Sequence, residues 1–334
     1  MSQIRYLVGY RPHERGQDAL SLAITLAQSF GVALDLVFVV REHSAFAPAY
    51  PPVGREEPLI AAQAQEWLDE AVATVPRGIE VATHVRYAPS IAEGLLSTAD
   101  ELGSGLVVIG SGSTGLARRH ELGAVATTML HQSSRPVCLV PRGYRASGPI
   151  EHIDCAAGLR PGGQELIDEA VEVAARRDLP LRVITMVDID SVEDVPEDSP
   201  LHAAVAADAP AGSGEVTVDA SGEAAVDPGG SGATDDPVDL VRAYVDGLIE
   251  RAVATHGHPA STHLVIARGG IRDAVASVPW DDSSILLVGS SRLAQPRRFF
   301  LGSTAHAMLR VLTVPVVAVP PGAHLDGPSA QEES

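Results

Sequence analysis

Lysine and asparagine are absent from this sequence, so all 24 of its basic residues are arginines. Schiff-base catalysis, pyridoxal phosphate enzymes and Walker-type phosphate loops all depend on the amine of one lysine. The missing residue therefore excludes three large classes of enzyme site before any motif is considered.

Aromatic residues and cysteine are also scarce. Aromatic residues make up 4% of the chain against 45% hydrophobic residues in total, so aliphatic side chains must form most of the core. Cys138 and Cys155 each lie inside an apolar run, which predicts two buried thiols and no disulfide. The pair His256 and His258 has no third ligand nearby in sequence, so we expect no metal site there.

No run of 18 apolar residues occurs, and the N-terminus does not resemble a secretory leader, so we expect a cytoplasmic protein without a membrane partner. The formal net charge of −19 disfavours binding to nucleic acid, which needs clustered positive charge. Thirteen acidic residues and no arginine lie between Asp188 and Pro237. This stretch has too little apolar surface to offset its ordering entropy, which predicts a disordered acidic loop at about residues 190–236.

An internal repeat gives the domain organisation. Residues 110–143 align without a gap with residues 289–322, and 14 of the 34 positions are identical. Earlier in the chain Gly16 and Gln17 align with Gly163 and Gln164 at a shorter offset, and the acidic loop supplies the difference. We therefore expect domains at residues 1–145 and 150–322, followed by a flexible tail at 323–334.

Short apolar runs alternate with amphipathic helical patterns in each copy. In the first copy we expect strands at 4–10, 33–40, 79–87, 106–109 and 137–140, and helices at 16–30, 56–75, from Ser90 as N-cap to about 101, and 124–131. In the second copy the strands fall near Ile153, Leu181, His263, Ile285 and Val316. This order predicts an α/β protein with two tandem, doubly wound, five-stranded parallel sheets.

Ligands of such sheets bind beyond the carboxyl ends of the strands, where the strand order reverses. The fourth strand of the first copy is followed there by Gly110, Ser111, Gly112 and Ser113, and then by Gly123 before a helix. Glycine-rich loops of this kind bring backbone N–H groups close to phosphate. Arginines also gather at this end of the sheet, at positions 11, 118, 119, 292, 297 and 298, and paired guanidinium hydrogen bonds favour phosphate too.

The loop, its helix and the fifth strands, Pro136–Val140 and Pro315–Val319, resemble the universal stress protein family. So does the opening strand, Tyr6–Tyr10, with the helix that follows it. The resemblance covers both copies and implies the adenine nucleotide alpha hydrolase-like fold. It also implies a role in stress response, ATP or AMP as ligand, and no catalytic residues.

The family's nucleotide pattern, Gly-x2-Gly-x9-Gly-Ser/Thr, is incomplete in both copies. Ser113 and Ala124 replace two of its residues in the first copy, and Arg292 replaces one in the second, which keeps Gly302 and Ser303. The acidic residue of ATP-binding members is replaced by Arg11 in the first copy and by Gly158 in the second. The remaining positions expected to contact a nucleotide are Val39, Gly110, Ser111, Gly112, Gly123, Val187, Gly289 and Ser290.

Two functions remain open at this point. One is a non-enzymatic regulator that binds ATP or AMP weakly, with the better site in the second copy; the other is an interaction protein that has lost its ligand. The family's dimer contact implies that the fifth strands, 137–140 and 316–319, pair within one chain as an internal pseudo-dimer and cover two sheet edges. A further homodimer and unknown protein partners are left open, and Phe299 and Phe300 mark an apolar segment for core packing or for a partner.

Overall fold

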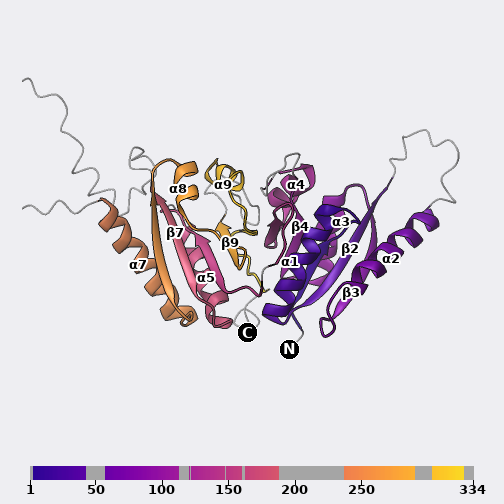
Figure 1. Ribbon diagram of the computed structural model, residues 1–334, viewed down its shortest axis with the longest axis horizontal. Coiled ribbons are helices and arrows are strands. Elements are labelled where there is room, and N and C mark those ends of the chain that lie inside the picture. The colour runs from indigo at the N-terminus through magenta and orange to yellow at the C-terminus, as the bar shows by residue number, and fades with distance from the viewer. Residues whose placement is uncertain are drawn as a thin grey trace, which may run out of the picture.

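The computed structural model describes residues 3–42, 57–112, 120, 122–146, 148–159, 162–187, 237–289 and 303–326. Figure 1 shows two α/β copies side by side, with helices on both faces of the strands. The acidic loop expected at 190–236 and the segment with Phe299 and Phe300 lie outside the described residues. Within the described ranges, each helix is too short or too polar to cross a bilayer.

The elements alternate as the sequence predicts. The first copy contains β1 (Arg5–Gly9), α1 (Glu14–Phe30), β2 (Ala33–Arg41), α2 (Glu57–Ala73), β3 (Val81–Ala88), α3 (Ile91–Leu102), β4 (Leu106–Gly110), α4 (Ala124–Gln132) and β5 (Val137–Val140). The second contains β6 (His152–Ala156), α5 (Gly163–Arg176), β7 (Leu181–Val187), α7 (Pro237–His256), β8 (Thr262–Arg268), α8 (Ile271–Ser277), β9 (Ser284–Gly289), α9 (Ser303–Leu309) and β10 (Val316–Val319).

The strands form one sheet in the order β3-β2-β1-β4-β5-β10-β9-β6-β7-β8. Each copy is parallel within itself, and the predicted strands are all present. The predicted pairing of the fifth strands is also confirmed, because β5 and β10 pair antiparallel with Cys138 opposite Val317. The two predicted five-stranded sheets are therefore joined edge to edge into a single sheet of ten strands.

Alternate residues of each strand face different helix layers. Tyr6 and Val8 belong to the core cluster that holds Leu22 and Leu26 of α1, and the intervening Leu7 belongs to the opposite cluster. The first cluster continues through α5 and α7 of the second copy, and the second through α8 and α9. The period-2 alternation of the strands thus decides which helices cover which face.

Local capping agrees with the sequence at α3. The Ser90 side chain accepts a hydrogen bond from the Glu93 backbone N–H at 3.2 Å, and its hydroxyl donates to the Glu93 carboxylate at 2.9 Å. This capping arrangement satisfies one of the unpaired N–H groups at the start of the helix. Because α3 packs beside β2, its start helps to shape the end of the sheet where the candidate site lies.

The tail starts later than the sequence predicts. Residues 323–326 are packed: Leu325 is fully buried, and Asp326 accepts hydrogen bonds from Tyr6 at 2.8 Å and from Arg177 at 2.6 Å. These partners are about 150 and 320 positions away in sequence, so no local pattern could reveal them. The expectation of a flexible tail from residue 323 is wrong for these four residues, and residues 327–334 lie outside the described ranges.

Candidate functional site

The crevice of the first copy lies at the carboxyl ends of β1, β2 and β4, as expected for a doubly wound sheet. Its cavity volume is about 150 Å³, and its lining includes Gly9, Arg11, Val39, Gly110 and Val125. Sites that enclose a drug-sized ligand usually measure about 300–1,000 Å³. The enclosed space is therefore large enough for only part of a nucleotide.

Arg11 is one of the residues that line this crevice. Its Nη2 donates to the backbone carbonyl of Val39 at 3.0 Å, and its guanidinium carbon lies 5.1 Å from the centre of the Phe38 ring. Burial, followed by the nearby Arg41, lowers the pKa of Arg11. Its buried Nε has no hydrogen-bond partner within the described part of the chain. The sequence suggested that Arg11 binds phosphate, but its guanidinium is hydrogen-bonded to the Val39 carbonyl. Val39 was itself expected to contact the ligand.

Gly110 is required by packing even without a ligand. A Cβ atom at this position would lie 2.2 Å from the backbone oxygen of Arg15, and one at Gly16 would lie 2.0 Å from that of Arg11. Real Cβ atoms do not approach backbone oxygens this closely, so Gly110 lets the start of α1 approach the end of β4, and Gly16 lets α1 approach the loop after β1. The first glycine of the motif is therefore explained by the fold itself.

Ser111 does not face the crevice. It is fully buried, and both its backbone N–H and its hydroxyl donate to the carbonyl of Val140 at 2.8 Å. Gly112 is buried beside it. Ser111 was expected to contact a ligand, but its N–H and hydroxyl both bond Val140 and fix the loop to β5. Ser113 lies outside the described residues.

The residues before and at the start of α4 leave free space beside Gly123 and contact the second copy through His120. Gly123 is the N-cap of α4, where no side chain caps the helix, and a Cβ atom there would meet nothing within 4 Å. Val125 and Ala126 in the first turn of α4 line the cavity. Just before them, buried His120 makes a 2.7 Å hydrogen bond through Nε2 with the carbonyl of Val314 in the second copy, and burial lowers the pKa of His120 to about 4.

The second copy differs at both equivalent positions. Exposed Gly158 follows β6 where Arg11 follows β1, so no side chain from that position enters the crevice. A Cβ atom at Gly289 would lie 3.4 Å from Leu166 Cδ2, an ordinary van der Waals contact, so packing does not demand a glycine there. The carbonyl of Val187 accepts the Gly269 N–H at 3.1 Å.

Several expected residues cannot be placed in this site. Ser290, Arg292 and Gly302 lie outside the described residues, as do the paired arginines at 118, 119, 297 and 298. Ser303 begins α9, in agreement with its expected position at the start of a helix. The structure therefore brings together Arg11, Val39, Gly110 and the start of α4, and it separates Ser111 from them.

Sequence reasoning missed one contact between expected site residues and one further set of residues. The contact between Arg11 and Val39 could have been suspected from a long cationic side chain replacing an acid at a strand end. A polar cluster on α5, in which Glu169 contacts His324 and Leu325, gave no such signal because its members are about 155 positions apart.

Comparison with known proteins agrees with this architecture. A universal stress protein from Mycobacterium tuberculosis (strain ATCC 25618 / H37Rv) is 28% identical over 320 residues, which cover 94% of this chain and 99% of that protein. A universal stress protein of Mycobacterium bovis matches over the same extent. The crystal structure of a universal stress protein from Archaeoglobus fulgidus DSM 4304 is 14% identical, with a TM-score of 0.58, and covers 96% of this chain and 100% of that one.

The family model for the Universal stress protein family matches twice, at residues 5–141 and 150–320. These two segments fill most of the chain and correspond to the two copies of the repeat. Together with the shared fold, they confirm the resemblance found in the sequence: the chain belongs to the Universal stress protein family.

Proposed function

We propose that this protein is a cytoplasmic, non-enzymatic regulator of the stress response that binds an adenine nucleotide, ATP or AMP, weakly in its second copy only. In this proposal the first copy has replaced its ligand by an internal contact and serves as a structural partner. Each copy corresponds to a domain, at residues 1–145 and 150–322.

The observation that carries the proposal is the difference between Arg11 and Gly158. In the first copy the Arg11 guanidinium bonds the Val39 carbonyl and lies over the ring of Phe38, so a bound base would have to compete with Arg11 for the Val39 carbonyl. Displacing it would cost a charge-assisted hydrogen bond, which is worth about 1.5–3 kcal/mol, or roughly 10- to 100-fold in affinity. Gly158 imposes no such cost on the second copy.

Gly289 supports the same assignment. Gly110 is needed for packing against Arg15, but the equivalent Gly289 has room for a methyl group beside Leu166. Close backbone approach to a ligand is another reason for glycine at a strand end. The second copy also keeps the motif's closing residues, Gly302 and Ser303.

Isothermal titration with ATP and AMP at millimolar concentration tests this proposal. We expect one nucleotide per chain in the wild type and at least tenfold weaker binding in Gly289→Val, since the added side chain occupies the approach to the strand end. Arg11→Asp removes the internal contact and restores an acid after β1, so we expect a second nucleotide per chain. Arg11→Ala separates the two effects by opening the crevice without the acid.

Three results would contradict the proposal: two nucleotides bound by the wild type, undiminished binding by Gly289→Val, or no heat from either ligand. The last result would favour the second candidate, an interaction protein without a ligand. That candidate is supported by the internal contact between Arg11 and Val39 in the first crevice and by the paired fifth strands, which need no nucleotide. Mass spectrometry of nucleotide retained through purification distinguishes the two candidates independently.

A further inference from the structure

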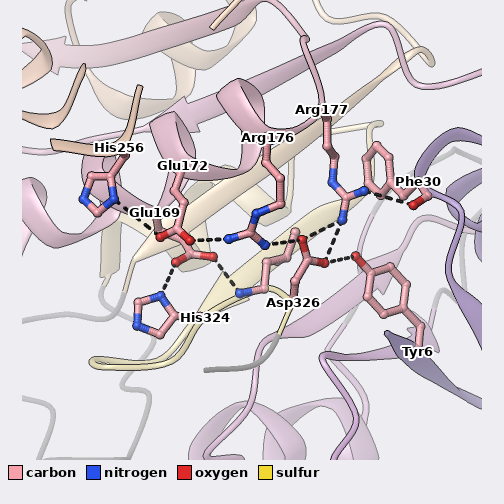
Figure 2. A network of polar contacts seen from close by, with 10 residues as sticks. Tyr6, Phe30, Glu169, Glu172, Arg176, Arg177, His256, His324 and Asp326 are labelled. Carbon is pink, nitrogen blue, oxygen red and sulfur yellow. Dashed lines mark hydrogen bonds and ion pairs between the residues drawn. The ribbon is translucent and has the colours of Figure 1, made fainter. Parts of the chain in front are cut away.

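A cluster of carboxylate and imidazole groups lies on α5, away from both crevices. Glu169 and Glu172 are three residues apart on one face of this helix, and His324 approaches them from the segment after β10. One ligand atom from each of these three residues lies within 4.8 Å of the others. Figure 2 shows the three side chains converging, with His256 of α7 beside them.

Each of these donors is held in place by neighbouring groups. Glu169, which is 5% exposed, accepts the Leu325 backbone N–H at 2.6 Å through Oε1, and its Oε2 lies 2.8 Å from His324 Nδ1. Glu172 accepts a hydrogen bond from Arg176 through Oε1, and its Oε2 lies 3.6 Å from His256 Nδ1. The contacts from the Leu325 N–H and from Arg176 come from outside the cluster, and outer contacts of this kind orient metal ligands in known sites.

The charges also favour a cation. Two carboxylates this close together repel each other when both are ionised. Arg176 contacts Glu172 with one arm, but its other arm goes to Asp326 rather than to Glu169. The imidazole Nδ1 atoms of His324 and His256 supply neutral nitrogen donors from two other elements, so the cluster differs from a simple acidic patch.

We propose that Glu169, Glu172 and His324 bind one Zn²⁺ ion, with His256 as the fourth ligand. Carboxylate oxygen and histidine nitrogen are normal zinc ligands at about 2.0–2.2 Å, and four ligands suit its tetrahedral preference. Small side-chain rotations bring the three donors of Glu169, Glu172 and His324, already within 4.8 Å of one another, to these distances around one ion, and His256 Nδ1 lies beside them, 3.6 Å from Glu172 Oε2. Zinc bound to His324 Nδ1 would replace the contact of this atom with Glu169 Oε2, and the neutral imidazole would then carry its proton on Nε2.

This ion would clamp the junction between the two copies. The segment that carries His324 continues to Asp326, which bonds Arg177 of the second copy and Tyr6 of the first (Figure 2). Arg177 also donates to the backbone carbonyl of Phe30 at the end of α1, at 3.2 Å. Zinc at the cluster therefore fixes the segment through which the copies contact each other, independently of any nucleotide.

The test uses the full-length, tag-free protein after removal of metal with a chelator. Isothermal titration with zinc chloride should show one site per chain, and zinc should raise the melting temperature. His324→Ala should weaken binding about tenfold or more, because loss of even an outer partner costs about 10- to 100-fold. His258→Ala is the matched control, since this exposed histidine is two residues from His256 and outside the cluster.

A second measurement keeps the proposal testable if a variant is unstable. Co²⁺ bound to the wild type should give the intense visible absorption of a four-coordinate site, and His256→Ala should change that spectrum. Absence of saturable one-to-one zinc binding in the wild type would overturn the proposal and leave the cluster as a hydrogen-bonded anchor for the tail. Equal loss of binding in His258→Ala and His324→Ala would overturn it as well.

Discussion

The two motif glycines, Gly110 and Gly289, offer a direct test of what the fold itself requires. They occupy equivalent positions at the ends of β4 and β9, yet the nearest atom of the described residues to an added Cβ atom would be the Arg15 backbone oxygen at 2.2 Å in the first case and Leu166 Cδ2 at 3.4 Å in the second. We predict that Gly110→Ala destabilises the protein and that Gly289→Ala does not.

The loss of stability in Gly110→Ala depends on whether the new Cβ atom meets a side chain or the backbone. A flexible side chain would move aside, but the Arg15 oxygen belongs to the backbone of α1, so relief requires a shift of the helix. Overpacking of this kind costs about 1–3 kcal/mol, and we expect about 2–3 kcal/mol here. The stabilisation of about 0.4–1 kcal/mol that alanine gives by restricting the unfolded chain is common to both variants and cancels in the comparison.

Thermal unfolding followed by circular dichroism measures the difference. At about 2–4 °C per kcal/mol for a unit of 150–250 residues, Gly110→Ala should melt about 4–12 °C below Gly289→Ala. Gly289→Ala should stay within about 0.5 kcal/mol of the wild type or rise slightly above it. Equal melting temperatures, or a lower one for Gly289→Ala, would refute the assignment of Gly110 to packing.

Two further predictions concern the junction and its pH dependence. Because Val317 lies opposite Cys138 across the antiparallel β5–β10 pair, Val317→Cys refolded under oxidising conditions should form a disulfide within one chain; cross-links found only between chains on a non-reducing gel would contradict the pairing. Burial lowers the pKa of His120 to about 4, whereas the unfolded chain binds that proton near pH 6.5, so the stability present above pH 6.5 falls as the pH drops toward 4. His120→Gln should reduce the loss of unfolding free energy between pH 6.5 and pH 4 by up to about 3 kcal/mol, measured by denaturant unfolding at several pH values, and an unchanged loss would be inconsistent with a buried neutral imidazole.

The fold could be predicted closely from the sequence because it rests on short-range signals. The apolar run from Leu106 to Ile109 and the cap at Ser90 have the same meaning wherever they occur in a chain. Because the chain contains two aligned copies, each helix and strand could be predicted from two sequences instead of one. Even the pairing of β5 with β10 followed from the resemblance of the fifth strands to a known dimer contact.

The candidate site was less predictable because side-chain direction depends on packing. Arg11 and Ser111 both stand where a ligand contact is expected, yet the first turns to the Val39 carbonyl and the second to the Val140 carbonyl. Both residues satisfy a buried backbone group that the sequence does not reveal as needing a partner. Motif position alone therefore overestimated the number of groups available to a ligand.

By itself the sequence determined the α/β class, the duplication and the family, since these depend on hydrophobic periodicity and on motifs contiguous in the chain. Only the tertiary structure decided that Arg11 bonds the Val39 carbonyl in the first crevice, that Gly110 serves packing, and that His324 and Asp326 anchor the end of the chain to α5 and to both copies. The physical reason is that hydrogen bonds and steric contacts act over a few ångströms in space. Their partners here are separated by as many as 320 positions in sequence.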